Sequence, residues 1–324
     1  MPRRVLLTGI TGFAGNHLAA RLLELGDEVH GLAHEPAPHP NIERIAADVR
    51  IHAGDLTDLA AVRSALAAAR PEVVFHLAAQ AIPTLASEDP LGAISVNVLG
   101  TATLLQAVAA QGGLRLVHAS SADVYGDPDR VPVTEDAPLR PRNVYAATKA
   151  AAEPLVRELG DRGSNSVTIL RPANQIGPRQ HPGLAASAFA RQIAEAEAGL
   201  AEPVIRHGRL DARRDFIDVR DMAEAYALAA GLSHQRSETY NVGSGSAPSV
   251  EWILATLVGL ARVPVRTEID PSRVRPGEPA ILALDASRFR ARTGWAPRIP
   301  IERSLADTLD HWRSVVARPV AARP

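Results

Sequence analysis

The sequence contains no cysteine, and its 35 basic residues include a single lysine, Lys149. The absence of cysteine excludes a disulfide framework and thiolate chemistry. A formal net charge of −1 gives no sign of the basic face that a nucleic-acid partner requires. No continuous apolar run reaches the roughly 18 residues that span a bilayer. We therefore expect a protein without a nucleic-acid partner, a membrane span or a metal.

The composition is that of an ordinary globular protein, with 46% hydrophobic and 22% charged residues. A length of 324 residues suits one large or two small domains with an ample core. Residues 4–8 already have the pattern of a buried strand, which leaves no room for a signal peptide before them. We expect the protein to reside in the cytoplasm.

The first half of the chain alternates short apolar segments with longer segments of helical periodicity. The predicted helices are residues 13–25, 59–69, 91–110 and 145–159, and the predicted strands are residues 4–8, 28–33, 50–53, 72–77, 114–119 and 166–170. Buried strands that alternate with helices are typical of a parallel sheet covered on both faces. The pattern predicts an α/β fold with a Rossmann-type, doubly wound parallel sheet.

After Arg171 the pattern loosens, and proline, glycine and arginine become frequent. Helical periodicity returns at residues 185–198, 219–231, 250–260 and 301–312. We predict a dinucleotide-binding domain over residues 1–171, completed by parts of the later chain. Residues 172–316 would form mainly a smaller α/β lobe for the substrate, and residues 317–324 a tail.

A glycine-rich segment follows the first predicted strand and opens the first predicted helix. Gly9, Gly12 and Gly15 have the spacing G-x-x-G-x-x-G. Glycines at this point permit a tight turn and let the backbone approach a pyrophosphate at the helix N-terminus. Its place inside a βαβ pattern makes the motif a strong prediction of a dinucleotide site.

The end of the second strand should meet the adenosine ribose of the cofactor. An acidic residue there favours NAD, whereas a neutral or basic one leaves room for a 2′-phosphate. This sequence has Ala33 followed by His34, which favours NADP(H) and leaves NAD(H) possible. Asp55 and Leu56 after the third strand should lie near adenine, and Leu77, Ala78 and Ala79 should line the cofactor after the fourth.

The only lysine belongs to a Y-x-x-x-K motif formed with Tyr145. Side chains four residues apart share one face of a helix. A lysine there lowers the pKa of the phenol and can hold a nicotinamide ribose, and the tyrosine can then exchange a proton at a carbonyl. Ser121, at the end of the fifth strand, can hydrogen-bond the reacting oxygen beside Tyr145.

Together these segments resemble the extended short-chain dehydrogenases/reductases. The resemblance runs from Arg4 to Trp312 and also rests on residues 97–101, Asn-Val-Leu-Gly-Thr. It implies a catalytic triad of Ser121, Tyr145 and Lys149. The implied cofactor-binding residues are Gly9, Gly12, Phe13, Ala14, Gly15, His34, Asp55, Leu56, Leu77, Ala78, Ala79, Tyr145, Lys149 and Pro172.

The later half resembles the branch of this family that acts on nucleotide-linked sugars. Residues 171–178 are similar to a segment whose Asn contacts the diphosphate, residues 208–216 to one that supplies an Arg, and residues 275–278 to the Arg-Pro-x-Glu of members that bind GDP-sugars. Arginine forks suit phosphates, and a carboxylate can accept from ribose hydroxyls. The implied substrate-binding residues are Ser121, Ala122, Asp123, Asn174, Arg179, Arg209, Arg214, Arg275 and Glu278.

Two positions after Ser121 favour one reaction within that branch. The 4,6-dehydratases carry two proton-transfer groups there, whereas this sequence has Ala122, which cannot be an acid, and Asp123. The segment is most similar to the GDP-4-keto-6-deoxy-D-mannose reductases that form GDP-D-rhamnose, although Ala173 and Gln175 depart from their Phe-Asn-His. An NAD-dependent 4-epimerase is the alternative, and a dehydratase or a non-catalytic binding member is less favoured. As in many relatives, helices 91–110 and 145–159 would pair in a homodimer.

Overall fold

The computed structural model describes residues 2–34, 39–162, 165–232, 236–274 and 280–317. Its centre is a seven-stranded parallel sheet with the order β11-β6-β5-β4-β1-β2-β3. The strands are β1 (Arg4–Thr8), β2 (Glu28–Ala33), β3 (Val49–Ala53), β4 (Val73–His76), β5 (Arg115–Ala119), β6 (Ser166–Pro172) and β11 (Glu238–Val242). The Rossmann-type α/β prediction is confirmed, and six of these strands lie within two residues of their predicted bounds.

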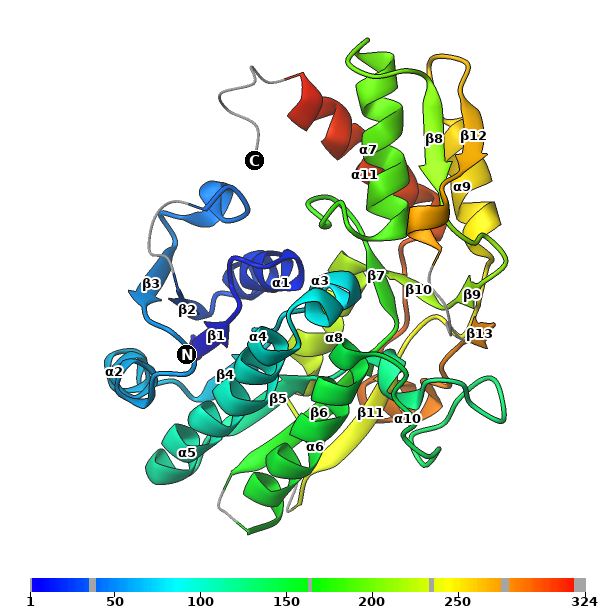
Figure 1. The fold of residues 1–324 in the computed structure, drawn as a ribbon. Helices are drawn as coiled ribbons and strands as arrows, with labels where there is room; N and C mark the ends of the chain where they lie inside the picture. The colour runs from blue at the N-terminus through cyan, green and yellow to red at the C-terminus, as the bar shows by residue number, and fades with distance from the viewer. Residues whose placement is uncertain (1, 35–38, 163–164, 233–235, 275–279, 318–324) are drawn as a thin grey trace.

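Helices cover both faces of this sheet, as alternation of apolar side chains along the strands requires. Val5 and Leu7 of β1 belong to one buried cluster with α1 (Phe13–Glu24) and α8 (Val219–Ala229). Leu6 belongs to the cluster on the opposite face, with α2 (Leu59–Ala69), α5 (Thr101–Gln111) and α6 (Val144–Arg162). Figure 1 shows α1 and α8 on one side of the sheet and α5 and α6 on the other.

The helix predicted over residues 91–110 consists of three parts. These are α4 (Pro90–Ile94), a π-helical turn over Ser95–Gly100, and α5. The whole stretch is long and apolar enough to cross a membrane by length and composition, a property that the sequence reading did not detect. Half of its most apolar window is buried inside the protein, and α5 packs on α2 and α6, so α5 belongs to the core of this fold.

The later chain builds a second layer beside the carboxyl edge of the sheet (Figure 1). Three helices, α7 (Ala185–Glu197), α9 (Val250–Gly259) and α11 (Ile301–Val316), share a separate apolar cluster. Short parallel pairs accompany them: β7 (Asn174–Ile176) with β10 (Phe216–Asp218), β8 (Val204–His207) with β12 (Arg266–Ile269), and β9 (Arg213–Arg214) with β13 (Ile281–Leu282). Two short helices, α3 (Pro83–Glu88) and α10 (Ser287–Thr293), complete the α-helices of the described residues.

Candidate active site

The glycine segment forms a tight connection between β1 and α1. Gly9 has a φ of +77°, which favours glycine, and a Cβ on Gly15 would lie 2.0 Å from the Gly9 carbonyl oxygen. Gly12 is the N-cap of α1 and provides no side-chain cap, and the first turn of the helix holds no acidic residue. The N-terminal amides of α1 are therefore suited to an anionic ligand, such as a dinucleotide phosphate.

The other predicted cofactor residues follow the carboxyl ends of neighbouring strands. His34 Nδ1 lies 3.5 Å from Asp55 Oδ2, with both side chains exposed. Hydrogen bonds from the Thr57 amide and hydroxyl to Asp55 lower the pKa of that carboxyl. The Ala78 amide donates to the Thr8 hydroxyl at 3.3 Å, which holds the backbone after β4 against the glycine turn. Leu56 is buried against Gly100, so only its backbone remains for a ligand.

The structure brings the three predicted catalytic residues together. Tyr145 and Lys149 lie one turn apart on α6, and Ser121 follows β5 as the N-cap of a short 3-10 helix over Ala122–Tyr125. Ser121 lies close enough to Tyr145 to lower the pKa of the phenol, although this effect is smaller than that of burial. Lys149 is buried, and its Nζ donates to the carbonyl oxygen of Ala119 at 2.8 Å.

Burial and neighbouring charges shift the pKa values of Lys149 and Tyr145. Burial lowers the pKa of Lys149 to about 8, and the charge of Glu153 partly opposes that shift. Burial first and the charge of Asp123 second raise the pKa of Tyr145, which Ser121 lowers only in part. The net direction of the Tyr145 pKa is therefore opposite to the lowering that the motif predicts, because burial and the charge of Asp123 dominate the shift. Tyr145 keeps its proton at neutral pH and is available as an acid.

The predicted substrate residues are distributed over several segments. Ala122 is buried in the core. The backbone amide of the next residue, Asp123, donates a hydrogen bond to the Ser121 hydroxyl. Asn174 begins β7, and its amide donates to the Asp215 carbonyl oxygen at 2.9 Å. Other members of the set lie in the later lobe or outside the described residues: Arg214 is on β9, Arg209 pairs with Asp211, and Arg275 and Glu278 fall in the undescribed segment 275–279.

Arg179 lies on the cofactor side of the site. Its Nη1 donates to Asn16 Oδ1 of α1 at 2.7 Å, and His17 Nε2 lies 3.0 Å from the Pro178 carbonyl oxygen. The segment that carries Arg179 therefore packs on the first turns of α1. The sequence expectation placed Arg179 with the substrate because its neighbours resemble a sugar-nucleotide segment, but its described hydrogen bond is to the helix that follows the glycine motif.

A family model described as GDP-mannose 4,6 dehydratase matches residues 6–308. The chain belongs to this family of extended short-chain dehydrogenases/reductases. It is 35% identical to a GDP-6-deoxy-D-mannose reductase of Pseudomonas aeruginosa over 98% of this chain and 99% of the relative. It is 33% identical to a UDP-glucose 4-epimerase of Mycolicibacterium smegmatis over 96% of this chain and 99% of that relative.

Solved structures give the same family assignment. The RMD structure of Pseudomonas aeruginosa complexed with NADPH has a TM-score of 0.82 at 32% identity, and the match covers 96% of this chain and 99% of the other. A UDP-glucose 4-epimerase of Thermus thermophilus complexed with NAD has a TM-score of 0.85 at 32% identity, with the same coverage. The chain is an enzyme of the nucleotide-sugar branch, in the oxidoreductase class.

One buried network of this family member was not predicted from the sequence. Glu153, one turn after Lys149, accepts from the Ser120 hydroxyl at 2.7 Å and from Arg171 Nε at 2.8 Å and Nη2 at 2.7 Å. Arg171 also donates to the Tyr125 hydroxyl at 2.7 Å. The spacing from Lys149 to Glu153 was a signal that both side chains share one face of α6. The network joins α6 to the ends of β5 and β6, and so holds Tyr145 opposite Ser121.

A second polar junction involves the π-helical turn. Asn97 Nδ2 donates to the Thr148 hydroxyl at 2.8 Å, and Asn97 Oδ1 accepts from the Gln80 amide at 2.8 Å. These bonds connect the turn to α6 and to the loop after β4. The sequence singled out Asn97 only through family resemblance, and the structure gives it a positioning role between two segments of the site.

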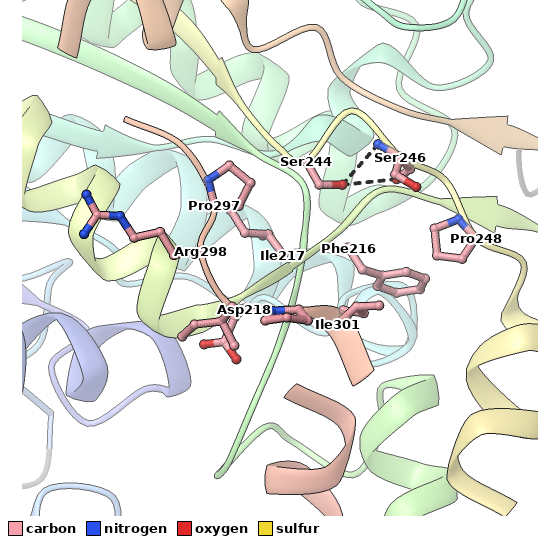
Figure 2. A pocket seen from close by; sticks show the side chains of 11 residues that line it. Phe216, Ile217, Asp218, Ser244, Ser246, Pro248, Pro297, Arg298 and Ile301 are labelled. Atoms are coloured by element: carbon pink, nitrogen blue, oxygen red, sulfur yellow. Dashed lines mark hydrogen bonds between the residues drawn. The ribbon is translucent and has the colours of Figure 1, made fainter. Parts of the chain in front are cut away.

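A separate cavity of 310 Å³ lies in the later lobe (Figure 2). Its walls combine apolar side chains with Asp218, Ser244 and Arg298, and none of the catalytic triad lines it. Asp218 already accepts from Arg220 and from the Ser304 hydroxyl. We therefore do not assign this cavity to the active site. No group of three or more His, Cys, Asp or Glu is placed to hold a metal ion among the described residues.

Proposed function

We propose that this enzyme reduces the C4 ketone of GDP-4-keto-6-deoxy-D-mannose to give GDP-D-rhamnose. The observation that carries the proposal is the placement of Ser121 beside Tyr145, with buried Lys149 one turn away on α6 and no acid at Ala122. This arrangement offers one proton and one hydrogen bond to a single substrate oxygen. A ketone reduction requires no other proton at the sugar.

The catalytic residues have distinct tasks in this reaction. A bound nicotinamide cofactor supplies the hydride to C4. Tyr145 donates its phenolic proton to the C4 oxygen. Because its pKa is raised, the phenol is protonated at neutral pH before this transfer. Ser121 holds the same oxygen by a hydrogen bond. Lys149 provides a positive charge near the phenolate that forms, since opposite charge favours the ionised phenol.

Dehydration of GDP-mannose would require more than this site contains. Expelling the C6 hydroxyl needs a proton donor beside it and a base for the C5 proton. Ala122 is buried and supplies neither, which leaves Asp123 as the one carboxylate next to Ser121. One carboxylate does not easily perform both tasks, so the proposal excludes dehydration as the main reaction.

NADPH is the proposed cofactor, with NADH as a possible substitute. The residues that would hold the dinucleotide are the glycines of the β1–α1 turn, and Ala33 at the end of β2 has no carboxylate to repel a 2′-phosphate. The Pseudomonas aeruginosa structure with NADPH supports this choice. The Thermus thermophilus structure with NAD keeps the alternative open.

The second candidate is a nucleotide-sugar 4-epimerase. It is favoured by the UDP-glucose 4-epimerases among the relatives, which have nearly the same identity as the reductase. An epimerase must retain its dinucleotide so that the hydride can return to the opposite face of the sugar. A purified protein that carries tightly bound NAD would support the epimerase, whereas one that binds and releases NADPH would support the reductase.

The deciding experiment is turnover of a substrate panel. We expect NADPH oxidation with GDP-4-keto-6-deoxy-D-mannose, a product mass two hydrogens higher, and no keto sugar formed from GDP-mannose alone. Formation of that keto sugar would overturn the assignment. Preference for a UDP- or dTDP-linked ketone would preserve the mechanism and contradict the GDP assignment, which rests on Arg275 and Glu278.

Residues 172–316 are the proposed nucleotide-sugar lobe, and the cytoplasm is the proposed location.

We also propose a homodimer formed through α4, α6 and the π-helical turn. Leu91 and Leu99 are 80% and 55% exposed, and Ile94 and Leu155 are also exposed. A group of exposed aliphatic residues on adjoining helices is typical of an interface. Light scattering should give a dimer for the unmodified chain and a monomer for Leu91→Glu. A monomeric unmodified chain would contradict the proposal.

A further inference from the structure

Arg179 has an unusual backbone and a defined side-chain contact. Its φ is +72°, in the left-handed region that side chains rarely adopt. Its guanidinium donates to Asn16 Oδ1 at 2.7 Å, and Asn16 Nδ2 in turn donates to the carbonyl oxygens of Gly12 and Phe13. The strained backbone of Arg179 and these hydrogen bonds place its positively charged guanidinium, which belongs to the later lobe, beside the glycine turn.

A second arginine approaches the same place from the segment after β2. Asn41 Nδ2 donates to the Thr11 carbonyl oxygen at 2.9 Å, which holds residues 41–45 against the glycine turn. Arg44 of this segment is exposed and close enough that its charge lowers the pKa of Arg179, after burial as the larger cause. Glu43 opposes the effect of Arg44 and is the weaker of the two charges.

Glu43 offsets the effect of the Arg44 charge on Arg179 only in part. Neither Arg179 nor Arg44 forms an ion pair with an acidic side chain in the part of the chain that the structure describes, and the side chain of Arg179 donates to Asn16 instead. Two like charges held beside the N-terminus of α1 repel one another and add to the positive end of the helix dipole. An anion between them would remove this repulsion, and a planar guanidinium fork suits a phosphate.

We propose that Arg179 and Arg44 together bind a phosphate group of the dinucleotide cofactor, with Arg179 supplied by the substrate lobe. The proposal rests on the proposed function only in requiring an NAD(P)H-type cofactor. The phosphate is either the 2′-phosphate of NADPH or the pyrophosphate that NADPH shares with NADH. Both present the same chemistry to the two guanidinium groups.

The position of Arg179 also ties cofactor binding to the substrate lobe. Gln180 Nε2 donates to the Gln175 carbonyl oxygen, and the Ser187 hydroxyl of α7 donates to the Gln180 carbonyl oxygen at 2.6 Å. Trp312 of α11 donates to that same hydroxyl at 2.9 Å. A cofactor phosphate held by Arg179 would therefore fix the segment that begins at Asn174, so the cofactor should bind before the sugar nucleotide.

The test is direct measurement of the dissociation constants of NADPH and NADH without any sugar. Arg179→Gly suits the positive φ and removes only the side chain, so it should fold normally. We expect Arg179→Gly and Arg44→Gln each to weaken NADPH binding by roughly tenfold or more, the range for a lost charge-assisted hydrogen bond. Arg162→Gln is the control, because Arg162 is an exposed arginine on α6 that pairs with Glu158.

The comparison of two cofactors identifies the phosphate. A loss confined to NADPH would support the 2′-phosphate, and an equal loss for NADH would support the pyrophosphate. Unchanged dissociation constants in Arg179→Gly, with a raised KM for the nucleotide sugar, would overturn the proposal and return Arg179 to the substrate. Because the binding assay contains no sugar, its result is independent of whether the enzyme reduces the proposed ketone.

Discussion

The buried pair of Glu153 and Arg171 offers a quantitative test of how the site is held together. Their side chains are 1% and 3% exposed, and their closest atoms are 2.7 Å apart. Glu153→Leu would leave the guanidinium of Arg171 in the core with only the Tyr125 hydroxyl and the Glu135 carbonyl oxygen as partners. Neither partner carries the negative charge that the arginine loses.

The expected cost follows from that unpaired charge. Removing one partner of a buried ion pair destabilises a protein by about 3–5 kcal/mol. At about 2 °C per kcal/mol for a large domain, Tm should fall by roughly 6 °C or more. Arg171→Met should cost less than Glu153→Leu, because Arg157 Nη2 still lies 3.1 Å from the carboxylate of Glu153.

The assay is thermal unfolding of both single variants and of the double variant Glu153→Leu/Arg171→Met. The double variant leaves neither charge buried alone, so it should be more stable than the sum of the two losses predicts, by at least about 1 kcal/mol. Glu158→Gln, which breaks an exposed pair on the same helix, is the matched control and should change Tm little. Strict additivity of the two single losses would refute the reasoning.

Three further outcomes test the catalytic group and the cofactor. Tyr145→Phe should lower kcat for the ketone by at least about 10²-fold, the usual contribution of a general acid, without changing the dissociation constant of NADPH; near-normal turnover would contradict the mechanism. The kcat/KM for reduction should fall as pH rises through about 8, where Lys149 loses its charge. Lys149→Arg should be inactive, because its guanidinium does not fit the buried contact with Ala119. Activity in that variant would argue against a specific role for the ammonium. Ala33→Asp should shift the ratio of kcat/KM towards NADH, and an unchanged ratio would show that the 2′-phosphate lies elsewhere.

The elements of the central sheet could be predicted because their signals are local. The βαβ alternation, the glycine spacing and the Y-x-x-x-K motif each lie within a few turns of chain, and the structure forms them within a few residues of the expected bounds. β11 was not predicted, because a five-residue strand in an irregular region has no periodicity that distinguishes it from a loop. Its place beside β6 is fixed by the pairing of Tyr240 with Leu170, a long-range contact.

The site contacts that the sequence missed are also long-range. Arg179 reaches Asn16 across 163 positions of the chain, and Tyr125 reaches Asn241 across 116. Family resemblance assigns such residues by their neighbours in sequence, which is why Arg179 was expected at the substrate. The direction of the Tyr145 pKa was missed for a related reason, since the spacing places Lys149 on the same face of α6 but does not show the burial of the phenol or its position near the charge of Asp123.

The charge of the single lysine, Lys149, depends on the buried ion pair of Glu153 and Arg171. Lys149 is buried, and desolvation alone would favour its neutral form, which could not stabilise a phenolate. Glu153 raises the pKa of Lys149, but Glu153 is itself buried and must be balanced by Arg171. An arginine at position 149 would remain charged without this support, yet its planar fork would not place a compact charge on the Ala119 carbonyl oxygen. The ion pair beneath α6 is therefore part of what permits a buried lysine to remain charged near neutral pH.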